Sequence, residues 1–157
     1  MFVGVLFALL LCHIVFLDVT KRRILNFSVV LIFVFGALNL VFQGVEWMVS
    51  EWHWAAISSL IAFIFFYFFY ATRLMGAGDV KLAAALAFCL GIEQFSWVWI
   101  VSAFLAVAYG VLCKLMVSMP ITPTFLRLNP MVGKGIRFVP YGALMCVSVF
   151  IVIYANL

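Results

Sequence analysis

Six long apolar runs take up most of this sequence, and they constrain its fold more than any other feature. They cover approximately residues 2–17, 25–42, 54–71, 77–90, 95–117 and 139–155. A helix needs about 20 apolar residues, with a range of roughly 17–25, to cross the hydrocarbon core of a bilayer. The runs therefore predict an all-α, polytopic integral membrane protein with six transmembrane helices.

The composition supports this prediction because it excludes a water-soluble fold. Hydrophobic residues make up 69% of the chain and charged residues only 9%, whereas soluble domains are roughly half apolar and a quarter charged. We therefore expect a single membrane-embedded domain over residues 1–157, without a soluble domain. The first run lacks the basic start and the cleavage site of a signal peptide, so we expect it to be retained as a span.

The charged residues are sorted between the two ends of the six runs. If all six cross the membrane, every Lys and Arg falls on one side, and Glu46, Glu51 and Glu93 fall on the other with four of the five tryptophans. Cationic loops collect in the cytoplasm, and tryptophans mark the interfaces. We therefore expect cytoplasmic basic loops and both termini on the outer, periplasmic side. The short run 77–90 could be re-entrant instead, but one basic loop would then lie outside.

The four cysteines give no sign of a metal site. Each lies singly inside an apolar run, and no CxxC pair occurs, although such pairs are typical of zinc sites and redox motifs. We therefore expect neither a metal nor a cofactor. The lipid bilayer is the predicted surrounding, no nucleic-acid partner is expected, and the oligomeric state stays open.

Asp18 and Asp79 are the only aspartates in the sequence, and the predicted topology places both at the cytoplasmic face. Each could have a structural role, because Asp18 could pair with Lys21 or Arg22 and Asp79 could begin a helix. Ionisable groups near hydrocarbon more often face a cavity or a partner. Two carboxylates that meet can share a proton, so that one activates water and the other polarises a peptide carbonyl. The pair therefore predicts aspartic protease chemistry.

Gly76 and Gly78 precede Asp79 directly. Without side chains, they would leave room for an extended substrate backbone beside the carboxylate, and they permit unusual backbone angles. A simple turn before a helix is the alternative, and for the glycines taken by themselves it is the better explanation.

The residues around both aspartates resemble those of prepilin peptidases, the membrane aspartic proteases that process type IV prepilins. "GAGDVKLAAAL" at 76–86 contains a GxGD motif, and "DVTKRRILN" at 18–26 has an aspartate, a basic turn and an asparagine in matching order. Leu25 stands where the family has proline, which leaves the bend of this turn open. "VPYG" at 139–142 is also similar to the small members of the family.

The resemblance implies that Asp18 and Asp79 are the catalytic pair. It also implies four supporting positions within the two motifs, which are Gly76, Gly78, Lys81 and Asn26. The implied substrates are prepilins or pseudopilins, which have a short basic leader before an apolar helix. Cleavage would occur at the cytoplasmic face of the bacterial inner membrane and would serve pilus assembly or secretion.

Large members of this family carry an added cytoplasmic domain with paired CxxC motifs, which is associated with N-methylation. Here residues 18–24 alone join the first two runs. The chain therefore looks like the compact peptidases of tight-adherence, or Flp-type, pilus systems, and we expect proteolysis without methylation.

Other functions remain open at this stage. A proton-coupled transporter component would also use paired acids, although nearer to the middle of the membrane. A non-catalytic pilus or secretion assembly factor would use the basic loops to bind a partner or anionic lipid. Presenilin-type GxGD proteases place Tyr before the first aspartate, whereas Leu17 stands there in this sequence. The proline-rich segment 119–138 could cover the site.

Overall fold

The computed structural model describes residues 2–21, 24–42, 45, 47–118 and 140–155, and all its regular elements in these ranges are helices. They are α1 (Phe2–Lys21), α2 (Asn26–Phe42), α3 (Trp52–Ala71), α4 (Ala77–Ser118) and α6 (Tyr141–Ala155). The all-α prediction is thus confirmed. The segment 119–138, expected as a possible cover, lies outside the described residues.

The long helix α4 consists of two arms that meet at Gly91. This glycine has φ 78° and ψ 169°, which interrupts the helical geometry. Glycine adopts positive φ easily because it lacks a Cβ atom. The break leaves helix carbonyls without their usual partners. One of them, the carbonyl of Cys89, accepts a hydrogen bond from the Val49 amide at 3.0 Å.

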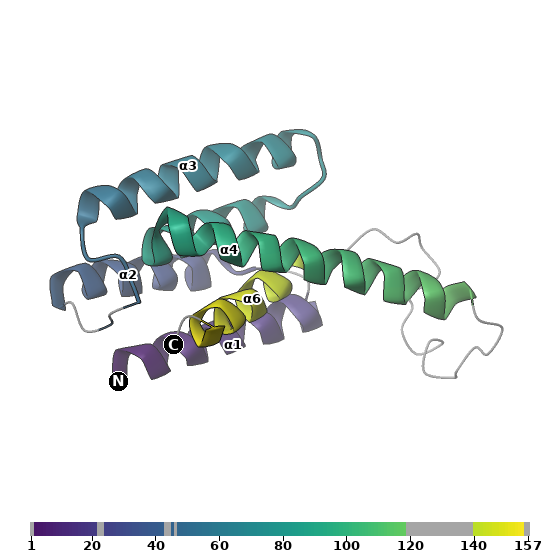
Figure 1. Cartoon of the computed structure of the whole chain (residues 1–157), viewed down its shortest axis with the longest axis horizontal. Helices are drawn as coiled ribbons and strands as arrows, with labels where there is room; N and C mark the ends of the chain where they lie inside the picture. The colour runs from purple at the N-terminus through teal and green to yellow at the C-terminus, as the bar shows by residue number, and fades with distance from the viewer. Residues whose placement is uncertain (1, 22–23, 43–44, 46, 119–139, 156–157) are drawn as a thin grey trace.

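The chain reverses its direction at this break (Figure 1). In one straight helix, Asp79 and Ser102 would lie about 34 Å apart. Instead, Asp79 lies beside Gly142, and the Ser102 hydroxyl is 3.1 Å from that of Tyr141. The two arms of α4 correspond to the separate runs predicted at 77–90 and 95–117.

The first arm of α4 lies at the centre of the bundle. It packs between α2 and α3, and α1 and α6 pack against each other beside it (Figure 1). Ala83, Ala85 and Ala87 are completely buried, and such small side chains let neighbouring helices approach closely. α2 and α4 approach each other closely at Gly36 of α2, because a Cβ atom there would lie 2.8 Å from Cys89 Sγ.

Within the part of the chain that the structure describes, two helices are long and apolar enough to cross a membrane, namely Trp52–Ala71 and Ala77–Leu115. The other apolar helices are shorter, over Gly4–Thr20, Asn26–Phe42 and Tyr141–Ala155. Large apolar side chains cover the outward faces of the helices, as a lipid surrounding would favour. The six-span count and the orientation of the termini stay predictions.

Acidic and tryptophan residues gather at one end of the bundle. Glu51, Glu93, Trp47 and Trp54 all line one hollow of about 380 Å³. It lies near the start of α3, whereas α1 ends and α6 begins at the opposite end (Figure 1). This arrangement agrees with the charge sorting in the sequence.

Candidate active site

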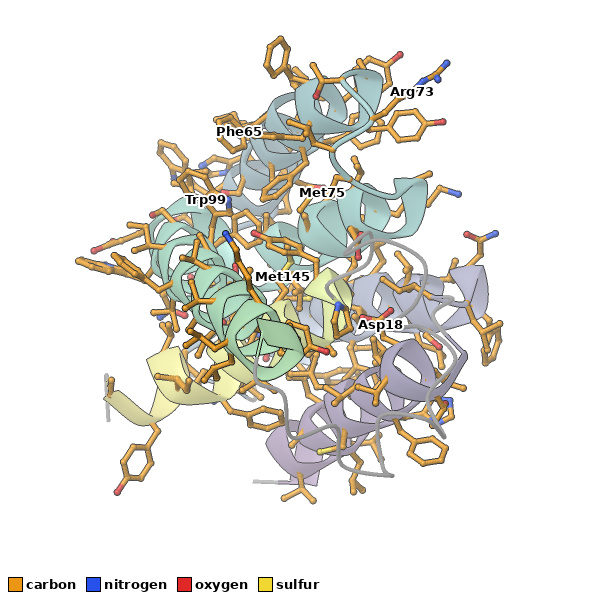
Figure 2. The ribbon with its side chains drawn as sticks, turned by 90° about the vertical axis from the view of Figure 1, so that its right-hand side faces the viewer. Asp18, Phe65, Arg73, Met75, Trp99 and Met145 are labelled. Atoms are coloured by element: carbon orange, nitrogen blue, oxygen red, sulfur yellow. The ribbon has the colours of Figure 1, made fainter. Side chains whose placement is uncertain are left out.

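The two aspartates come from helix ends that meet at the same end of the bundle. Asp18 lies in the last turn of α1 and is 7% exposed. Asp79 lies in the first turn of α4 and is half-buried. Figure 2 shows Asp18 between α1 and the start of α6, among the side chains of the bundle interior. The structure therefore brings together the two residues that the sequence singled out.

The first turn of α6 holds both carboxylates. The backbone amide of Ala143 donates a hydrogen bond to Asp18 Oδ2 at 2.7 Å, and the backbone amide of Gly142 bonds to the Asp79 carboxylate. The first amides of a helix have no partner within the helix and form its positive end, so they suit negative groups. Pro140 precedes this turn, and the first internal bond runs from the Leu144 amide to the Pro140 carbonyl.

Gly142 lies in contact range of both aspartates. A Cβ atom built there would lie 3.1 Å from Asp18 Oδ2 and 3.1 Å from Asp79 Oδ1. These two oxygens are therefore separated by at most twice that distance. At such a separation, the charge of one carboxylate disfavours the charged form of the other. The pair can thus supply a base and an acid at the same time.

The glycines before Asp79 provide space rather than unusual backbone angles. Neither has a positive φ. A Cβ atom on Gly76 would lie 3.3 Å from Asp79 Oδ2, so this position keeps the side of the carboxylate clear. Gly78 instead faces Ile24, whose Cβ would lie 3.3 Å from an added Cβ. Gly78 therefore packs against the connection between α1 and α2.

Lys81 and Asn26 contact each other and not the aspartates. Lys81 Nζ donates a hydrogen bond to Asn26 Oδ1 at 3.2 Å. This bond links the start of α4 to the start of α2, and so joins the two motifs that carry Asp79 and Asp18.

Several residues of the site were missed in the sequence. Gly142 and Ala143 contribute backbone amides, which no side-chain pattern reveals. Ile24 lies against Gly142, because a Cβ atom built on this glycine would be 2.6 Å from Ile24 Cδ1. Tyr141, the first residue of α6, bonds to Ser102 on the second arm of α4. The "VPYG" segment at 139–142 was the one available signal.

The comparisons with known proteins point to one family. No curated protein and no solved structure matches the chain. The sequence profile of the type IV leader peptidase family matches residues 5–111. This match includes Asp18 and Asp79 and ends before α6. Because it covers more than half of the sequence, the chain belongs to the type IV leader peptidase family.

Proposed function

We propose that this chain is an intramembrane aspartic endopeptidase that removes the leader peptide from type IV prepilins or pseudopilins. The observation that carries the proposal is the convergence of Asp18 and Asp79 on the first turn of α6. Membership of the family supports leader peptidase activity in general, and the geometry supports these two side chains as the catalytic groups.

The two carboxylates would divide the chemistry between them. The charged one accepts a proton from a water molecule as the water oxygen attacks the scissile carbonyl carbon. The neutral one donates a hydrogen bond to the carbonyl oxygen, and as the C–N bond breaks the leaving amine takes the proton that the first carboxylate removed from water. Asp79 is the more accessible of the two carboxylates to water, because it is half-buried whereas Asp18 is 7% exposed and bonded to Ala143.

The position of the site supports cleavage at the cytoplasmic face of the bacterial inner membrane. Arg73, which follows α3 at the same end as the aspartates, is directed away from the bundle (Figure 2). In multi-pass proteins, basic residues collect on the cytoplasmic side. We propose six spans, with the break at Gly91 separating the fourth from the fifth, and both termini on the outer side.

The connection between α1 and α2 supports the compact form of the enzyme. α1 ends at Lys21 and α2 begins at Asn26, so no domain fits between them. We propose proteolysis without N-methylation, on Flp-like prepilins with short leaders. The product would serve pilus assembly or secretion.

A cleavage assay tests the proposed function directly. The chain is co-expressed with a short-leader prepilin, and wild type is compared with Asp18→Asn and Asp79→Asn by substrate size on a gel. Glu51→Gln is the matched control, because it makes the same chemical change at the opposite end of the bundle. We expect both aspartate variants to lose cleavage at normal protein levels and the control to retain it. Cleavage by either aspartate variant would favour an assembly factor or a transporter component instead.

A further inference from the structure

A groove of about 620 Å³ lies between α2 and α3, apart from the aspartates. The first arm of α4 forms its floor, and Figure 1 shows α2 and α3 on either side of this arm. Its walls are almost entirely apolar. The largest side chains that line it are those of Val29, Val30, Phe33, Leu60, Phe63 and Phe88. Such a surface takes a hydrocarbon ligand.

One end of the groove carries two polar side chains, those of Lys81 and Asn26. Because Asn26 Oδ1 accepts the hydrogen bond from Lys81, the amide nitrogen of Asn26 remains as a second donor. Among the described residues, no carboxylate lies within ion-pair distance of the Lys81 ammonium. Lys81 is exposed at this end of the groove, so its ammonium is open to an anion from outside the bundle.

We propose that this groove binds an anionic phospholipid, with its acyl chains along the apolar walls and its phosphate on Lys81 and Asn26. Basic sites between membrane helices are known to select anionic headgroups. The lining residues span about two helical turns on each helix, or roughly 10 Å. An acyl chain can lie along an apolar groove of this length.

The lipid would stabilise the contact between the start of α2 and the start of α4, which carries Asp79. The phosphate would lie against the one hydrogen bond that joins Lys81 to Asn26. Lys81 lies two residues after Asp79, about 3 Å further along the helix axis. The proposal concerns binding and holds whether or not the aspartates are catalytic.

Native mass spectrometry of the purified full chain tests the proposal. The protein is exchanged into micelles that contain equal amounts of dioleoyl phosphatidylglycerol and dioleoyl phosphatidylcholine, and retained lipid is counted. We expect wild type to retain the anionic lipid about fivefold more, the preference that one lysine beside an anionic headgroup supplies. Lys81→Gln should lose this preference and Lys81→Arg should keep it. Lys114→Gln is the matched control, because it removes an exposed cation from the second arm of α4.

A second pair of variants separates the groove from the rest of the surface. Ala56→Phe fills the groove from the α3 wall and should reduce the retention of both lipids, while Ala108→Phe adds the same ring to the exposed second arm of α4 and should not. Equal retention of the two lipids by wild type would overturn the proposal. The proposal would also be overturned if Lys81→Gln kept the full preference for the anionic lipid, or if Ala56→Phe retained as much of both lipids as wild type. Occupation of the groove by an apolar substrate helix that excludes the lipid would also contradict it.

Discussion

The backbone amide of Ala143 donates a 2.7 Å hydrogen bond to the carboxylate of Asp18, although the two residues are 125 positions apart in the sequence. This contact makes the last helix part of the candidate site. Backbone amides have fixed directions within a helix, so they hold a carboxylate more rigidly than a flexible side chain would. The catalytic proposal therefore depends on α6 as much as on the two helices that carry the aspartates.

Gly142→Ala should reduce the cleavage rate about tenfold at unchanged protein level. The new methyl group would lie 3.1 Å from an oxygen of each aspartate, so both carboxylates must shift by a few tenths of an ångström, and small misplacements are expensive in catalysis. Initial cleavage rates of purified enzyme check this. Gly110→Ala is the control, because a Cβ atom there meets nothing within 4 Å. Equal rates for the two variants would contradict the role of Gly142.

Adding Ile24→Ala to Gly142→Ala should restore stability without restoring the rate. The Cδ1 atom of Ile24 would lie 2.6 Å from the new methyl group, and shortening this side chain removes that clash but leaves the crowding of the aspartates. Thermal unfolding and cleavage rates of both single variants and the double variant form the cycle. Joint recovery of rate and stability would show that Gly142 acts through packing alone.

The fold and the aspartate pair could be predicted because their signals lie in side-chain patterns. Apolar runs of the right length predicted helices, and the interruption between 90 and 95 predicted the reversal that Gly91 makes. Charge sorting placed Asp18 and Asp79 at one end, where the structure has them. These inferences needed only local composition and the geometry of a bilayer.

The remainder of the site could not be predicted in this way, because it consists of backbone groups and close approaches. Nothing in the side chains of Gly142 and Ala143 shows that their amides bond to carboxylates. Gly78 was a candidate for substrate space, yet its neighbour is Ile24. The contacts between the starts of different helices depend on packing in three dimensions. The sequence does not give the distances between those helices.

Lys81→Met and Asn26→Ala should destabilise the protein by similar amounts, and the double variant should be no less stable than either one. Both changes remove the same 3.2 Å hydrogen bond, whose net contribution is about 1 kcal/mol. Thermal unfolding in detergent measures all three variants. Fully additive losses would mean that the two side chains act independently, and the link between the two motifs would then have no energetic basis.

Gly91→Ala should destabilise the protein by about 1–3 kcal/mol, because a non-glycine residue is strained at φ 78°. Its Cβ atom would also lie 2.7 Å from Val49 Cγ2. Adding Val49→Ala should relieve the clash but leave the backbone strain, so only part of the loss should return. Gly4→Ala, with nothing within 4 Å, is the control in the same unfolding measurement. Complete recovery in the double variant would show that positive φ is not required at the reversal.

The cleavage rate of wild type should pass through a maximum as the pH rises. The proposed mechanism needs one charged and one neutral carboxylate, and oxygens of Asp18 and Asp79 both lie beside Gly142. At low pH both are neutral and no base remains, so the rate falls; at high pH both are charged and no acid remains, so it falls again. Initial rates of the purified enzyme across the acid and neutral range, with a parallel unfolding measurement at each pH, check this. A rate that only rises to a plateau, in protein that stays folded, would mean that a single carboxylate acts as base and that the shared proton has no catalytic role.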